Sequence, residues 1–218
     1  MKLSLQRLQT GWLRLLQNRR LAHVSRQVAR HARPVPQQKP VAFFNASSRL
    51  GGLSQNAAFS QLTAWSVQLA GTPVVHFACR AGMSRCVLGT DPDDHTASPP
   101  CPMCIAQSER LLASAPTHWF EYRCDEDVAA GLQGLDFDAL ANFRHKSDHW
   151  QDAIPLGELV LPSLRWALRR HHLPDDTATR HQLREYILSA YHVALEFERF
   201  LHKKRPQAVV LFNGLQFP

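Results

Sequence analysis

The first ninety residues of this 218-residue chain contain no aspartate and no glutamate. They carry 12 of the 25 Lys and Arg residues, whereas all 18 acidic residues occur from Asp91 onward. The front of the chain is therefore strongly basic, and the remainder has a net charge of −5. Such a basic segment favours a polyanionic surface as partner, either anionic lipid or nucleic acid.

Long apolar runs are also missing. No stretch approaches the roughly eighteen consecutive apolar residues that a membrane-spanning helix needs. The apolar residues near the N-terminus alternate with charged ones and do not form the apolar region of a secretory signal. We therefore expect a chain without a membrane span or secretory leader. Its hydrophobic content of 44% and charged content of 20% are typical of a folded globular protein.

Cysteine is scarce, yet four of the five cysteines lie in one predicted loop, residues 79–104: Cys79, Cys86, Cys101 and Cys104. Cys101 and Cys104 have the spacing at which two thiolates from one helical turn bind a tetrahedral metal. Zinc fits four sulfur ligands, and an iron–sulfur cluster uses the same ones. Redox chemistry at Cys-Pro-x-Cys, a disulfide and free buried thiols are the other interpretations. Clustered cysteines without a leader favour the reducing cytoplasm and metal ligation.

Residues 1–34 predict a basic amphipathic helix, because Leu residues and Trp12 recur near helical spacing between arginines. Such a helix suits an anchor on the anionic inner face of the cytoplasmic membrane, or packing against its own domain or a partner. Mitochondrial transit peptides share this composition. Residues 35–40 contain Pro36 and Pro40 and predict a linker.

After the linker, apolar strands alternate with helices. Strands are predicted at 41–45, 73–78, 117–123 and 208–212, and helices at 55–70, 102–114, 136–143, 156–171 and from Asp176 to about Lys204. Ser54 is the predicted N-cap of the first of these helices and Gly71 its terminator. The alternation predicts an α/β fold with a doubly wound, Rossmann-like parallel sheet over residues 41–218.

Ligands of parallel sheets bind at the carboxyl ends of the strands. Asn45 and Asn213, which precedes Gly214, end the first and last predicted strands and suit contacts to a sugar or phosphate. Each equally suits a cap on its own turn. The turn after the first strand leads into a helix N-terminus that suits an anion, although Gly51-Gly52 lacks the spacing of a phosphate-binding loop.

Several motifs resemble a single family: FFNAS (43–47), GLSQNAA (52–58), AGMSRCVLGT (81–90), PPCPMC (99–104), LPSLRW (161–166) and VLFNG (210–214). They resemble the amino-terminal half of bacterial capsule or surface-polysaccharide biosynthesis proteins of the GT-B glycosyltransferase type. The resemblance spans about residues 41–218. It implies two Rossmann-like domains with the active site between them.

The family's amino-terminal domain faces a glycan or lipid-linked acceptor, and its carboxyl-terminal domain binds the nucleotide-sugar donor. Because family members continue beyond such a Phe-Asn-Gly strand for another domain's length, we expect a C-terminally truncated fragment that is inactive alone. The expected substrate-binding residues are Asn45, Arg49, Gly52, Ser54, Asn56, Asn213 and Gly214. His76 is the candidate general base, since imidazole titrates near neutrality; a core histidine or a metal ligand is the alternative.

Two other classes of function stay open. One is a non-enzymatic zinc-binding module that docks nucleic acid or a partner through its basic half. Trp12 is the one tryptophan of residues 1–34 and no nucleic-acid-reading motif is recognisable, which weighs against nucleic acid. The other is a thiol redox protein that uses Cys101 and Cys104 and binds no stoichiometric metal.

Overall fold

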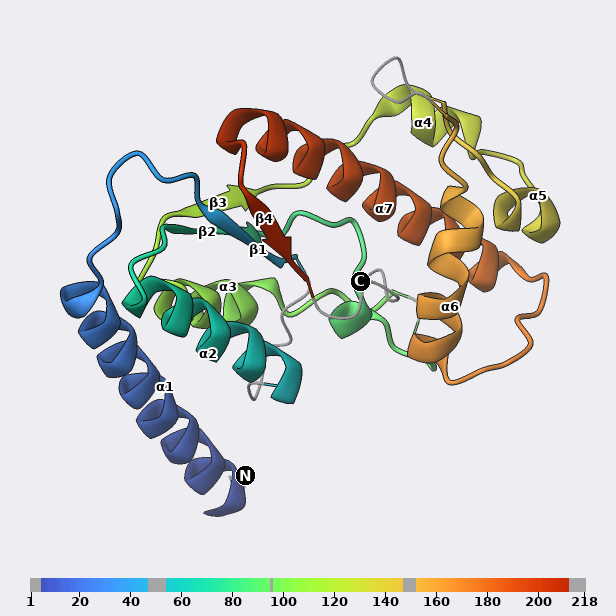
Figure 1. The fold of residues 1–218 in the computed structure, drawn as a ribbon. Coiled ribbons are helices and arrows are strands. Elements are labelled where there is room, and N and C mark those ends of the chain that lie inside the picture. The colour runs from blue at the N-terminus through green and yellow to red at the C-terminus, as the bar shows by residue number, and fades with distance from the viewer. Residues whose placement is uncertain (1–4, 47–53, 95, 147–151, 212–218) are drawn as a thin grey trace. The chain divides into compact units, whose positions relative to one another are not determined.

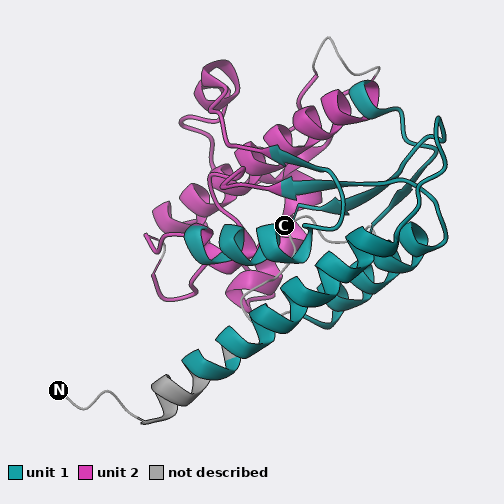
Figure 2. Cartoon of the chain, turned by 90° about the vertical axis from the view of Figure 1, so that its left-hand side faces the viewer, with its two compact units in different colours: residues 1–78, 102–119, 203–212 teal, residues 79–101, 120–202, 213–218 magenta. Residues whose placement is uncertain are grey.

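The structure is a computed structural model of the 218-residue chain, and it describes residues 5–46, 54–94, 96–146 and 152–211. The chain forms two compact units (Figure 2). Unit 1 comprises residues 1–78, 102–119 and 203–212, and unit 2 comprises residues 79–101, 120–202 and 213–218. The region predicted as one domain, residues 41–218, is therefore shared between two units, and the predicted helix at the N-terminus belongs to unit 1.

A four-stranded parallel sheet is the centre of unit 1 (Figure 1). Its strands are β1 (Val41–Asn45), β2 (Val74–Cys79), β3 (Thr117–Phe120) and β4 (Ala208–Val210), in the order β3-β2-β1-β4. β1 pairs in parallel with β2, with Val41 opposite Val74, and with β4, with Val41 opposite Ala208. The predicted α/β class and parallel sheet are thus confirmed. The strand order is that of the first four strands of a Rossmann sheet.

Both faces of the central strand β2 are buried. Side chains alternate between the two faces of a strand, yet every residue from Val74 to Ala78 is buried. On one face, Phe43 and Val74 pack with Ala64 of α2 (Gln55–Leu69). This burial is compatible with a Rossmann-like sheet, and a doubly wound arrangement stays a prediction.

Three helices form a second apolar cluster in unit 1. Val28 of α1 (Leu5–His31), Trp65 of α2 and Leu111 of α3 (Cys101–Leu111) pack together. Trp65 also donates a hydrogen bond from Nε1 to Ser114 Oγ, 3.1 Å away. Gly71 follows α2 with a φ of 88°, as expected of a helix-terminating glycine. Ser54 accepts a hydrogen bond from Ala57 N, which confirms it as the N-cap of α2.

Unit 2 is mainly helical. Its elements are η1 (Val87–Gly89), α4 (Glu126–Gly131), α5 (Phe137–Ala141), α6 (Leu156–Leu168) and α7 (Thr177–Lys204), whose last two residues belong to unit 1. Leu140, Leu164, Tyr186 and Ile187 are fully buried in its core. Pro162 lies inside α6, which ends at Leu168 before Arg169 in the left-handed conformation, and not at the predicted His171.

Two predicted strands are longer than the observed ones. β3 ends at Phe120, and the carbonyl of the next residue, Glu121, accepts a hydrogen bond from the His192 side chain. β4 ends at Val210, and the predicted residues Phe212, Asn213 and Gly214 lie outside the described part. Among the described residues, none of the helices has the length and apolar character required to span a bilayer.

Candidate functional site

The strand order places a topological switch point between β1 and β4. From β1 the chain first extends the sheet through β2 and β3, and then β4 is added on the opposite side of β1. In open parallel sheets, ligands bind beside the carboxyl ends of the strands at such a point. Asn45 is the last residue of β1 and Ser54 begins α2, so both lie in segments bordering this position.

Asn45 is held by hydrogen bonds inside unit 1. Its Nδ2 donates to His76 Nδ1 at 3.0 Å, and its Oδ1 accepts from Ser60 Oγ at 3.1 Å. The Asn45 residue is 8% exposed. Its amide therefore joins β1, β2 and α2, and the predicted contact between this side chain and a substrate would have to replace one of these bonds.

His76 is a core residue in this structure. It is fully buried, and burial lowers its pKa from 6.5 to about 4. Asn45 Nδ2 can only donate, so His76 Nδ1 accepts and the ring is neutral at pH 7. Because no part of the ring reaches solvent, this placement opposes the assignment of His76 as the general base.

The other predicted substrate-binding residues lie close in sequence to the same edge. Ser54 caps α2 with its hydroxyl, and Asn56 is exposed in the first turn of that helix. Arg49, Gly52, Asn213 and Gly214 lie outside the described residues. The structure thus brings Asn45, His76 and Ser60 together, whereas the sequence had indicated only the first two.

The four clustered cysteines are not gathered into a ligand set. All four are described, and among the described residues no group of three or more His, Cys, Asp or Glu side chains is placed to bind a metal ion. Cys79, Cys86 and Cys101 belong to unit 2, and Cys104 belongs to unit 1. A structural zinc and an iron–sulfur cluster at these cysteines therefore both stay predictions.

Cys86 is the cysteine with a resolved change in acidity. Burial raises the pKa of its thiol, hydrogen bonds from the backbone of Gly89 and Leu88 lower it, and the neighbouring Cys101 raises it further. The net direction is upward, so the thiol is protonated at neutral pH. That state suits a buried structural thiol better than a redox nucleophile.

Arg85 organises the loop between β2 and α3. Its side chain is buried, and Nη1 donates to the carbonyl oxygens of Gly89 and Ala97, each at 2.9 Å. One guanidinium therefore ties together two distant parts of the loop. The sequence analysis missed this role, because the partners are backbone carbonyls that leave no signature in the sequence.

Two serines fix the start of the same loop to α7. Ser84 Oγ donates to the carbonyl of Glu185 at 3.0 Å and lies 3.1 Å from Ser189 Oγ. Ser189 Oγ also donates to the Arg85 carbonyl at 2.9 Å and accepts from Arg85 N at 3.1 Å. Hydrogen bonds among the loop's own residues and to α7 thus hold the loop in place.

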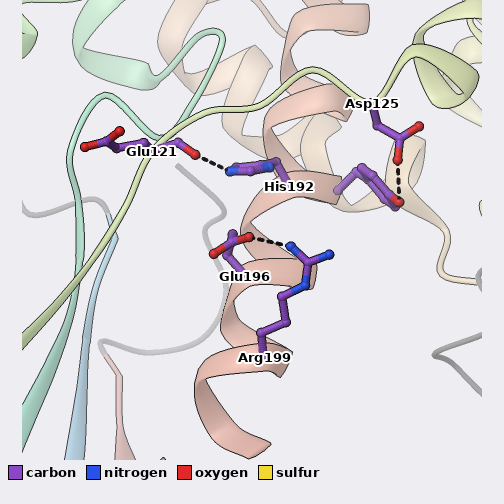
Figure 3. A network of polar contacts seen from close by, with 6 residues as sticks. Glu121, Asp125, His192, Glu196 and Arg199 are labelled. Carbon is purple, nitrogen blue, oxygen red and sulfur yellow. Dashed lines mark hydrogen bonds and ion pairs between the residues drawn. The ribbon is translucent and has the colours of Figure 1, made fainter. Parts of the chain in front are cut away.

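A second polar network joins α7 to the segment after β3 (Figure 3). His192 Nε2 lies 2.8 Å from the carbonyl of Glu121, so Nε2 carries the proton, and Tyr191 donates to Asp125 at 3.0 Å. Burial lowers the pKa of His192, whereas the Glu121 carbonyl raises it. One helical turn further along, Arg199 pairs with Glu196 at 2.7 Å. These contacts position the chain, and the effect of burial outweighs that of the Glu121 carbonyl, so the net shift in the pKa of His192 is downward.

A small polar cavity of about 180 Å³ lies near the N-terminus of α7. It is lined by Pro92, Asp93, Leu168, Arg170, Asp176, Ala178, Thr179 and Gln182. Gln182 is 3% exposed, and its Oε1 has no hydrogen-bond partner in the described part of the chain. The cavity can accommodate a small polar group, and none of the residues predicted as functional lines it.

No protein-family profile, curated protein or solved structure matches this chain.

Proposed function

We propose that this chain forms the acceptor-side domain of a glycosyltransferase of the GT-B type that acts in the biosynthesis of capsule or another surface polysaccharide. The observation that carries the proposal is the parallel sheet with strand order β3-β2-β1-β4. Its switch point adjoins the FFNAS and GLSQNAA segments, two of the motifs that resemble this family.

The proposed chemistry is displacement at the anomeric carbon of a nucleotide-sugar. A base takes the proton from the acceptor hydroxyl as that oxygen attacks, and the nucleoside diphosphate leaves with the electrons of the broken bond. The described residues would position the acceptor through the first turn of α2, where Asn56 is exposed and backbone N–H groups face outward. The phosphates of the donor would bind to a second domain.

His76 is not the base in this proposal, because it is buried and neutral. On this proposal the chain works in the cytoplasm, against the inner face of the membrane where a lipid-linked acceptor would be presented.

The proposal is tested by measuring binding of the chain to an array of bacterial capsule and cell-surface oligosaccharides. We expect Arg49→Ala and Asn56→Ala each to weaken binding to the recognised glycan by about tenfold, as for loss of one good hydrogen bond to a ligand. Arg165→Ala, an exposed arginine on α6, is the matched control and should bind like the parent chain. A folded chain that binds no glycan, or variants that bind as the parent does, would contradict the proposed site.

A further inference from the structure

Charge is divided between the two units. Unit 1 contains 14 Lys and Arg residues and a single acid, Glu109, which gives a net charge of +13. Unit 2 contains 11 Lys and Arg residues and 17 acids, a net charge of −6. The positive charge of the sequence therefore belongs to one compact body and attracts a polyanion to that body.

The outer side of α1 combines apolar and basic residues. Leu21 and Val28 pack against α2 and α3, and nine residues along a helix correspond to about two and a half turns. A residue nine positions from one of these two therefore lies on the side turned away from that contact. This applies to Trp12 and Arg30, each nine residues from Leu21, and to Arg19, nine residues from Val28. All three are exposed, and Trp12 is 66% exposed.

The apolar residues of α1 thus lie on two sides and not on the single face that the sequence predicted. Leu13 and Leu15, next to Trp12, are 67% and 48% exposed. Arg19 and Arg26 follow further along the same helix and are exposed as well. The exposed tryptophan and leucines offer apolar area and the arginines offer positive charge, and these are the two contributions by which a helix binds the surface of an anionic bilayer.

Helix α2 lies beside α1 (Figure 1), and its outer face is uncharged. No residue of α2 is charged, and Phe59, Leu62 and Leu69 are 61%, 55% and 53% exposed. The hydroxyls of Thr63 and Ser66 donate to carbonyls of their own helix, each at 2.9 Å. Hence these two hydroxyls are already satisfied, which lowers the cost of removing them from water.

We propose that the outer faces of α1 and α2 in unit 1 bind the surface of an anionic lipid bilayer. The arginines of α1 contact lipid phosphates, and Trp12, Leu13 and Leu15 enter the boundary between headgroups and acyl chains. Binding to nucleic acid would use the arginines but would leave the exposed leucines without a role. Association of two copies through these faces would bring two strongly positive units together.

The test is co-sedimentation of the chain with phosphatidylcholine vesicles that either contain or lack phosphatidylglycerol. We expect binding only to the anionic vesicles, and a decrease as salt is raised. Arg19→Gln with Arg26→Gln should weaken binding about thirtyfold, since each basic residue near an anionic surface contributes about 1 kcal/mol. Trp12→Ala with Leu15→Ala should also weaken it, while leaving the salt dependence nearly unchanged.

Matched controls come from unit 2. Lys146→Gln with Arg165→Gln removes the same amount of charge from exposed positions, and Trp166→Ala removes a tryptophan that is 49% exposed. Both should bind vesicles like the parent chain. Equal loss in the control variants would show that net charge and not this surface governs binding, which would overturn the proposal.

Three further results would also overturn it. One is the absence of preference for anionic vesicles by the folded chain at low salt. Another is binding to single-stranded RNA that exceeds vesicle binding and is unaffected by Trp12→Ala. The third is a dimer, seen by analytical ultracentrifugation, that Trp12→Ala with Leu15→Ala dissociates while vesicle binding is absent. Because the vesicles carry no glycan, failure here would leave the acceptor-binding test unaffected.

Discussion

Arg85 is a buried cation whose described hydrogen bonds go to backbone carbonyls and not to a carboxylate. Hydrogen bonds from a charged donor contribute more than neutral ones, and this donor satisfies two carbonyls at once. Gly89 and Ala97 belong to the loop that also contains Cys86, so the centre of this loop is an arginine. At the scale of single residues, Arg85 is the centre of unit 2's loop.

Replacing Arg85 with methionine should therefore destabilise unit 2. The carbonyls of Gly89 and Ala97 would lose their donor, and we expect a decrease of about 2–4 kcal/mol in the free energy of unfolding. The free energy of unfolding is measured by urea denaturation monitored with circular dichroism. Arg165→Met, at an exposed position on α6, should change the same quantity by less than about 0.5 kcal/mol. A change in Arg85→Met as small as in this control would contradict the role of Arg85.

His76 should make stability depend on pH. Its pKa is about 4 in the folded chain against 6.5 when unfolded, so the unfolded chain takes up the proton first. The contribution of neutral His76 to the free energy of unfolding is fully present above pH 6.5. It decreases as the pH drops from 6.5 towards 4, and below pH 4 it no longer changes with pH. Each pH unit in this window corresponds to about 1.36 kcal/mol, which amounts to about 2.4 kcal/mol between pH 7 and pH 4.5.

The measurement is the free energy of unfolding at both pH values in the parent and in His76→Gln, whose side-chain carbonyl can still accept from Asn45. His192, whose pKa is also lowered, contributes in the same direction in both proteins and cancels in the comparison. A parent and a variant with equal slopes between these pH values would show that His76 does not titrate as a buried neutral group.

At the scale of elements, the packing of α6 against α5 depends on Gly157. A Cβ at this position would collide with the carbonyl oxygens of Leu140 and Ala141, and Gly157 N donates to the Phe143 carbonyl at 3.0 Å. Backbone atoms cannot rotate away as a side chain can. We expect Gly157→Ala to destabilise unit 2 by about 1–3 kcal/mol, measured by urea denaturation.

Gly131, at the end of α4, gives the matched comparison. A Cβ there would meet nothing within 4 Å, so Gly131→Ala should be neutral or stabilising by up to about 1 kcal/mol. If the two alanine variants had the same stability, the close contact between α5 and α6 would be absent in solution.

Elements with local signals could be predicted from the sequence. β1 begins and ends where its apolar run does, and Ser54 and Gly71 mark the ends of α2 as expected. α4 was missed because it is short and has a single buried apolar residue, Val128. The site was predicted less well. His76 is buried against Asn45, 31 residues away, and Arg85 donates to backbone carbonyls, which leave no signature in the sequence.

At the scale of the whole molecule, the shift from basic to acidic residues along the sequence corresponds to a positively charged unit 1 and a negatively charged unit 2. The change in composition near Asp91 indicated that the chain has a basic and an acidic part. Each unit is built from three separate segments of the chain, so composition along the sequence could not locate the boundary between the units. Unit 1 holds both the positive charge and the sheet whose switch point carries the proposed acceptor site. On our account, one body therefore approaches the membrane and receives the acceptor.

The central claim is that the chain is part of a sugar transferase, and the most direct measurement is a transfer assay on the complete gene product. Radiolabelled nucleotide-sugars are incubated one at a time with the protein and with surface glycans, including lipid-linked ones. We predict that one donor labels a glycan, and that Arg49→Ala reduces this labelling while Arg165→Ala does not. A folded, complete protein that transfers no sugar from any donor to any of these acceptors would contradict the account.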